Sequence, residues 1–161
     1  MTHEHWLGVE KLPRFEDPMT ALLWGARIYL AHAVSGEPTP PVLNLLFKNV
    51  LSVDARPALF DSLDFLIYHS TSPFVLHQLH CLEVSAHERA LADAIRAIQM
   101  GSLQDYCGAM ERVLTPNDAL VVGPKIQTLA NALASIEAQG FVQSANIIAP
   151  TQFRQTAEAT H

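Results

Sequence analysis

Helix-start signals recur along the sequence and constrain its fold more than any other feature. Each combines a residue that can cap the first turn of a helix with a proline at or near the first helical position, where a missing N–H costs little. They stand at Asp17-Pro18, at Thr39-Pro40-Pro41, at Asp54 with Pro57, and at Thr115-Pro116. No segment shows alternating strands joined by hairpin turns. The sequence therefore predicts an all-α fold, a single-domain bundle of about six helices.

The same signals set the expected helix boundaries. A glycine at Gly36 suits the end of the first helix, and Ser102 can cap a short helix after the central part of the chain. Gly123-Pro124 should kink or divide the last helix, because proline lacks a backbone donor and crowds the preceding turn. The expected helices cover about residues 18–35, 41–50, 55–69, 102–113 and 116–139, with one more in the central stretch.

A chain of 161 residues fits one domain with a sizeable core. We expect an irregular N-terminal arm over residues 1–16, a helical domain over 17–148, and a polar, frayed tail over 149–161. The first helix is apolar almost all round, and Arg27 and His32 are its main interruptions. Such a helix lies at the centre of a bundle or is shared between the core and a subunit interface.

The stretch from Pro73 to Gly101 holds three of the eight histidines and the longest periodic pattern. If residues 74–100 form one helix, then His77, Cys81 and His87 lie on one stripe, and His80 lies at its edge. Side chains four positions apart are close enough to share a ligand. This interpretation predicts a site for zinc or another transition metal, completed by a residue of another helix.

A second interpretation gives the opposite answer. Ser85 and Glu88 have the spacing of a capping box, directly before a run of strong helix formers. The helix would then begin at Ser85, with residues 74–84 extended before it. His77 and Cys81 would lie about 13 Å apart at the rise of an extended chain and would not share one ion. We favour this second interpretation, because the capping box is a local signal with a known mechanism.

The composition points to association rather than to nucleic acid or membrane binding. Charged residues make up 16% of the chain and hydrophobic residues 49%, whereas soluble domains average about 25% charged. With so few charges, apolar surface should remain after one core is filled, and this predicts a homo-oligomer, most simply a two-fold dimer. The net charge is −6 and no basic run exists, which argues against nucleic acid and anionic membrane as partners.

Two cysteines in helix-like sequence, and an N-terminus without a signal-peptide pattern, predict a cytoplasmic protein. Glycine-rich phosphate loops, G-x-S-x-G and H-E-x-x-H do not occur, so no catalytic residue is assigned. The leading functional prediction is protein–protein contact, as a homodimer, adaptor or regulatory subunit, with no cofactor. Two alternatives remain open: an enzyme with an unrecognised pocket, and a metal- or small-molecule-binding protein that uses a His/Cys cluster. The members of that cluster are His77, His80, Cys81 and His87.

Overall fold

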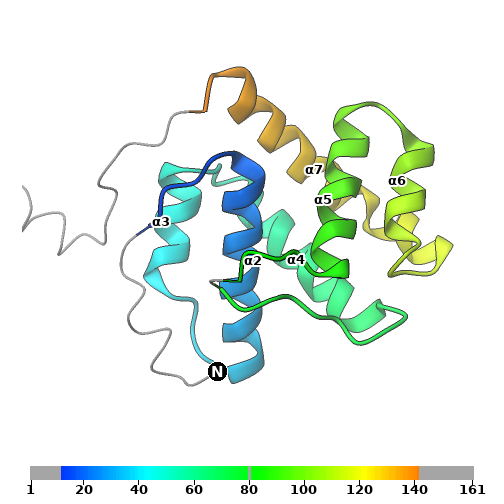
Figure 1. Ribbon diagram of the computed structural model, residues 1–161, viewed down its shortest axis with the longest axis horizontal. Helices are drawn as coiled ribbons and strands as arrows, with labels where there is room; N and C mark the ends of the chain where they lie inside the picture. Colours follow the sequence, from blue (N-terminus) through cyan, green and yellow to red (C-terminus); the bar gives the residue numbers. More distant parts are fainter. Residues whose placement is uncertain (1–11, 80, 142–161) are drawn as a thin grey trace, which may run out of the picture.

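The computed structural model describes residues 12–79 and 81–141. Within these residues the chain forms six α-helices and no β-strand, so the predicted all-α, single-domain bundle is confirmed (Figure 1). The helices are α2 (Pro18–Ser35), α3 (Pro41–Asn49), α4 (Ala55–His69), α5 (Ala86–Gln99), α6 (Leu103–Met110) and α7 (Pro116–Ala138).

Four of the predicted caps form as expected, at Asp17, Ser85, Ser102 and Thr115. The Asp17 side chain accepts a hydrogen bond from the Thr20 N–H at 2.7 Å, and Thr115 does the same for the Asp118 N–H at 3.2 Å. Ser102 caps α6. Asp54 stands directly before α4, but its side chain makes no capping hydrogen bond, because the residue itself has helical backbone angles. That helix start was therefore correctly located, although its mechanism differs.

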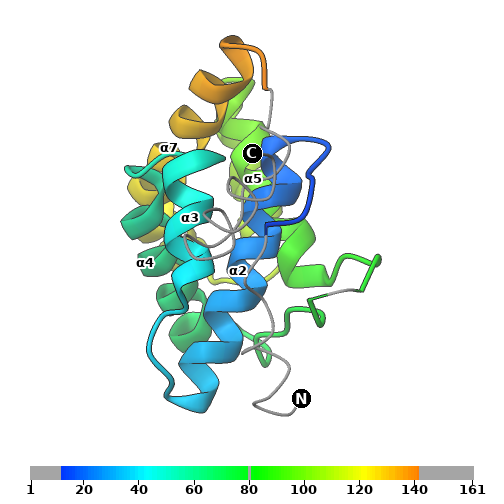
Figure 2. The ribbon, with the colours of Figure 1, turned by 90° about the vertical axis from the view of Figure 1, so that its left-hand side faces the viewer.

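Helix α2 packs against α3, α4 and α7, and α3 runs beside it in Figure 2. Of its 18 residues 8 are buried, so its almost all-round apolar sequence is enclosed only in part. The contact with α3 is very close at Gly25, where an added Cβ atom would stand 2.6 Å from Cδ2 of Leu46. Glycine at this position leaves room for the buried Leu46 side chain of α3.

Helix α7 continues through Gly123-Pro124, so of the two predicted outcomes, a kink or a division of the helix, the division does not occur. Proline removes one intrahelical hydrogen bond, the one that the carbonyl of Leu120 would accept. Packing of α7 against α4 and α5 holds the helix on both sides of this point. A single missing hydrogen bond is thus outweighed by burial of the helix face that contains Val122, Ile126 and Leu129.

By length and composition alone, α7 would be able to cross a membrane, and it is the one such helix in the described part of the chain. About a third of its apolar window, 33%, is buried inside the bundle. A core helix of a soluble protein passes the same test, and the fold is compatible with a soluble protein. The cytoplasmic location stays a prediction.

The predicted N-terminal arm is partly described. Residues 12–16 form no helix, yet Leu12 and Phe15 are buried against the core. Phe15 meets Trp24 of α2 edge to face, with ring centroids 5.5 Å apart. Residues 1–11 and 142–161, which include the predicted tail and its boundary, lie outside the described residues.

Candidate functional site

Ser85 begins helix α5, as the second interpretation predicted. The Ser85 hydroxyl accepts from the Glu88 N–H at 3.1 Å, and the Glu88 carboxylate accepts from the Ser85 N–H at 2.9 Å. The alternative of one continuous helix from residue 74 was therefore wrong, because the capping box starts the helix at Ser85. Residues 74–79 and 81–84, which we call the strap, run outside the helices across α2 (Figure 1). Within the strap, the Cys81 N–H donates to the Gln78 carbonyl and forms a turn.

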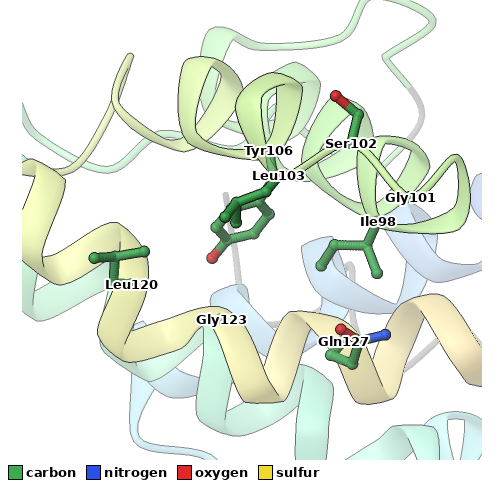
Figure 3. A pocket seen from close by; sticks show the side chains of 8 residues that line it. All are labelled: Ile98, Gly101, Ser102, Leu103, Tyr106, Leu120, Gly123 and Gln127. Carbon is green, nitrogen blue, oxygen red and sulfur yellow. The ribbon is translucent and has the colours of Figure 1, made fainter.

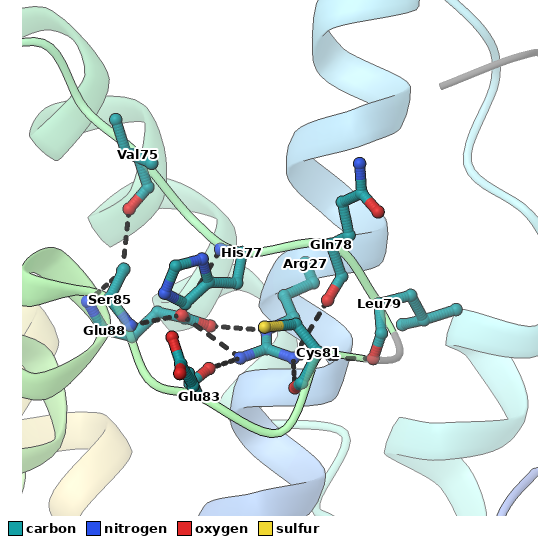
Figure 4. A network of polar contacts seen from close by, with 9 residues as sticks. All are labelled: Arg27, Val75, His77, Gln78, Leu79, Cys81, Glu83, Ser85 and Glu88. Atoms are coloured by element: carbon teal, nitrogen blue, oxygen red, sulfur yellow. Dashed lines mark hydrogen bonds and ion pairs between the residues drawn. The ribbon is translucent and has the colours of Figure 1, made fainter.

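Arg27 of α2 holds the strap by its backbone (Figure 4). Its Nε and Nη2 atoms both donate to the carboxylate of Glu88. The other donors reach carbonyl oxygens of the strap. Those bonds go to Gln78 at 3.1 Å, Leu79 at 3.4 Å, Cys81 at 2.7 Å and Glu83 at 2.9 Å.

The Arg27–Glu88 pair is nearly sealed from water. The exposed fractions of the two side chains are 9% and 0%. Burial acts to raise the pKa of Glu88, but the hydrogen bond and charge of Arg27 and the backbone N–H groups of Ser85 and His77 outweigh it, so the pKa is lowered. The carboxylate is charged and fully engaged, which makes this pair a clamp on the strap rather than a reacting centre.

The predicted ligand residues take separate roles around this clamp. The His77 N–H donates to Glu88 Oε1 at 3.3 Å, and the Cys81 carbonyl accepts from Arg27. The His87 ring accepts from the Val75 N–H at 3.3 Å. Within residues 12–79 and 81–141, no group of three or more His, Cys, Asp or Glu side chains is placed to hold a metal ion. His80 lies outside the described residues, so the four-residue metal site stays a prediction.

Sequence reasoning missed a groove at the other end of α5 (Figure 3). The groove has a volume of about 410 Å³ and lies between the end of α5, α6 and the first half of α7. No residue that lines it is charged. Its lining consists of Ile98, Gly101, Ser102, Leu103, Tyr106, Leu120, Gly123 and Gln127.

Tyr106 fixes one wall of this groove. Its side chain comes from α6, and its O–H donates to the Ala119 carbonyl of α7 at 2.6 Å. Burial raises the pKa of Tyr106 to about 12, helped by the neighbouring Cys107, so the phenol stays protonated and keeps donating. At Gly123 an added Cβ would lie 3.6 Å from the Tyr106 hydroxyl oxygen, so the missing side chain leaves the groove open there.

Large apolar side chains project into solvent at and beside the groove. The exposed fractions are 83% for Met100, 69% for Leu103, 58% for Leu120 and 57% for Val121. Exposed apolar patches mark sites of interaction in soluble proteins. The sequence held one signal for it: Met100 and Leu103 flank the Gly101-Ser102 turn, where polar residues are usual.

A second hollow of about 560 Å³ lies between the α3–α4 connection and the second half of α7. Its wall mixes charged Lys48 and Asp54 with polar residues such as Thr128 and Asn131. One large apolar side chain of its lining projects into solvent, that of Val53 at 65% exposed, whereas the first groove has two, Leu103 and Leu120. No protein-family model, curated protein or solved structure matches this chain, so its function has to be inferred from these residues.

Proposed function

We propose that the protein acts through protein–protein contact, and that it pairs with a second copy of itself through the α5–α6–α7 groove. One observation carries this proposal: a groove without charged lining residues is lined in part by Leu103 and Leu120, whose side chains project into water, and exposed Met100 directly precedes its lining residue Gly101. The centre of an interface is typically depleted in charge and rich in Met and aromatic side chains.

A two-fold contact requires a patch that fits itself. Two features of this face favour such a contact: a hollow walled by Tyr106 and lined in part by Leu103, and projecting side chains such as those of Leu103 and Met100. Projecting residues of one copy can enter the hollow of the other, and the symmetry repeats the contact. Each chain has a net charge of −6, so an uncharged face is also where two copies repel each other least.

Association is tested by sedimentation equilibrium of the wild type and of two groove variants, Leu103→Asp and Leu120→Asp. Leu103 is the first residue of α6, where an acidic side chain favours the helix, so this variant should fold. Val53→Asp is the matched control, because Val53 is 65% exposed and lies in the turn before α4.

The expected result is a dimer for the wild type and for Val53→Asp, and a monomer for both groove variants. Burying an unpaired carboxylate at the interface should weaken association at least about a hundredfold. A wild type that stays monomeric between about 1 and about 100 µM contradicts the proposal. Equal dimerisation of all four proteins would place the contact on another face and contradict the groove as its site.

A further inference from the structure

The second hollow, between the α3–α4 connection and the second half of α7, has the size of a small-molecule site. Its volume is about 560 Å³, within the range of roughly 300–1,000 Å³ over which proteins bind small ligands. Its lining comes from residues 47–54 and residues 128–139, two segments that are far apart in the chain. Packing of α4 against α7 brings these segments together, so the hollow depends on the fold and not on one loop.

The inner part of this lining is apolar. The side chains of Phe47 and Leu51 are buried, with exposed fractions of 2% and 7%. Ala132 and Ile136 of α7 are partly buried and pack against the core. Sites for small molecules typically combine such an apolar surface with a few polar groups that fix the orientation of the ligand. The hollow therefore suits a ligand with an apolar body.

Two opposite charges line the same hollow and do not pair with each other. Lys48 lies in the last turn of α3, and Asp54 stands directly before α4. Neither side chain makes a hydrogen bond or an ion pair within the described part of the chain. Lys125 of α7, by contrast, reaches Asp61 of α4 at 3.1 Å. One ammonium and one carboxylate are thus available to a ligand, and together they give the lining no net charge.

Neutral polar side chains of α7 complete the wall. Asn131, Ser135 and Gln139 are spaced four positions apart, so they follow one face of the helix. The Asn131 oxygen accepts from the Gln127 amide at 3.3 Å, which leaves the two N–H donors of Asn131 for a ligand. The side chains of Ser135 and Gln139 make no hydrogen bond within the described residues. These groups can both donate to a carboxylate and accept from an ammonium.

We propose that this hollow binds a small zwitterion with an apolar body, of the class of the apolar α-amino acids and their short peptides. The ligand's carboxylate pairs with Lys48, its ammonium pairs with Asp54, and its apolar side chain lies against Phe47 and Ile136. A ligand with one charge leaves the opposite charge of the wall unused. A free amino acid and a short peptide share this chemistry and differ in the distance between their end charges, because each residue adds up to about 3.3–3.6 Å.

The test is an NMR titration of the ¹⁵N-labelled 161-residue chain with L-leucine and with L-leucyl-L-leucine. At about pH 6.5 the α-amino and α-carboxyl groups of both probes are charged. The amides of Asp54 and Ile136 report on the hollow, and the Asp118 amide in the first turn of α7 is the reference. The C-terminal amide of each probe carries only the ammonium, and its N-acetyl form carries only the carboxylate.

Two variants each remove one charge from the wall, Lys48→Gln and Asp54→Asn. Both positions are exposed, and neither side chain has a bond within the described residues to lose. Lys125→Gln is the matched control, because Lys125 does not line the hollow. The blocked probes test the same two charges in the wild type, so a variant that fails to fold does not prevent a decision.

We expect saturable shifts at Asp54 and Ile136 with a Kd below about 10 mM for at least one zwitterion, and no shift at Asp118. The tighter probe tells whether the ligand class is the amino acid or the peptide. Each blocked form should bind about fivefold more weakly, as for an exposed ion pair. Lys48→Gln should weaken the zwitterion about fivefold and leave the amide form unchanged, and Asp54→Asn should weaken the zwitterion and leave the N-acetyl form unchanged.

The absence of saturable shifts in the hollow with both zwitterions at up to about 50 mM overturns the proposal. Equal binding of the zwitterion and its blocked forms overturns it, because the two charges are then not recognised. Binding of the zwitterion that either wall variant leaves unchanged also contradicts it. Lys48 and Asp54 do not line the α5–α6–α7 groove, so any of these results would leave the proposed self-association standing.

Discussion

Arg27 of α2 and Glu88 of α5 are 61 positions apart in the chain and form a salt bridge in which the carboxylate is fully buried. The same guanidinium binds four carbonyls of the strap, so one side chain joins α2, the start of α5 and the segment between α4 and α5. The first prediction follows from this dependence on a single residue.

Replacing Arg27 with methionine should destabilise the protein by about 3–5 kcal/mol, because Glu88 is left charged and buried without a partner. The double variant Arg27→Met with Glu88→Gln should lose less than the sum of the two single variants. Urea unfolding measures all four proteins. A loss below about 1 kcal/mol for Arg27→Met, or strict additivity, would show that the pair is not the clamp described.

Acid should weaken the clamp in a defined range of pH. The pKa of Glu88 is lowered in the folded protein, so its stabilising contribution is present above the ordinary value near 4.5 and is lost as the pH falls through that value to the folded pKa. The difference in urea midpoint between the wild type and Glu88→Gln should shrink from about pH 7 to about pH 3. Glu111→Gln, at an exposed position, is the control and should show a constant difference.

Substitution by alanine should lower the stability of the protein at Gly25 and raise it at Gly108. A Cβ at Gly25 meets fully buried Leu46 at 2.6 Å, so overpacking of about 1–3 kcal/mol exceeds the gain in helix propensity. A Cβ at Gly108 of α6 meets nothing within 4 Å, so Gly108→Ala should stabilise by about 0.5–1 kcal/mol. Thermal unfolding distinguishes them. An equal rise in Tm for both variants would contradict the close approach of α2 and α3.

Tyr106→Phe should cost about 0.5–1.5 kcal/mol, because the Ala119 carbonyl loses the hydroxyl that donates to it. Tyr68→Phe is the matched control, since Tyr68 is 84% exposed. Chemical denaturation of both variants gives the comparison. If Tyr106→Phe unfolds at the same midpoint as Tyr68→Phe, the wall of the groove does not depend on this bond.

Local signals in the sequence predicted the helices well, since a cap acts on residues three positions away. Asp17, Ser85 and Thr115 each fixed a helix start that the structure confirms. The features that the sequence analysis missed or predicted wrongly depend on tertiary packing. Burial against α4 and α5 carries α7 through Pro124, and the sequence alone marked Arg27 as a mere interruption because its partner Glu88 is distant in the chain.

The groove was unpredictable for the same reason, because its walls come from three helices and only their packing brings Ile98, Tyr106 and Leu120 together. The low charge content predicted that apolar surface would remain exposed, but composition does not say where on the fold that surface lies. The metal site at His77, His80, Cys81 and His87 depended on the continuous helix, and the capping box at Ser85 removes that geometric support for it.

Hydrogen exchange read by mass spectrometry at two protein concentrations tests the proposed self-association most directly, because it reports association and its location together. If two copies pair through the groove, peptides covering residues 98–106 and 117–124 should exchange more slowly at the higher concentration, and peptides from α3 should not change. Exchange that is independent of concentration in the groove peptides, or slowing confined to other parts of the chain, would contradict the account.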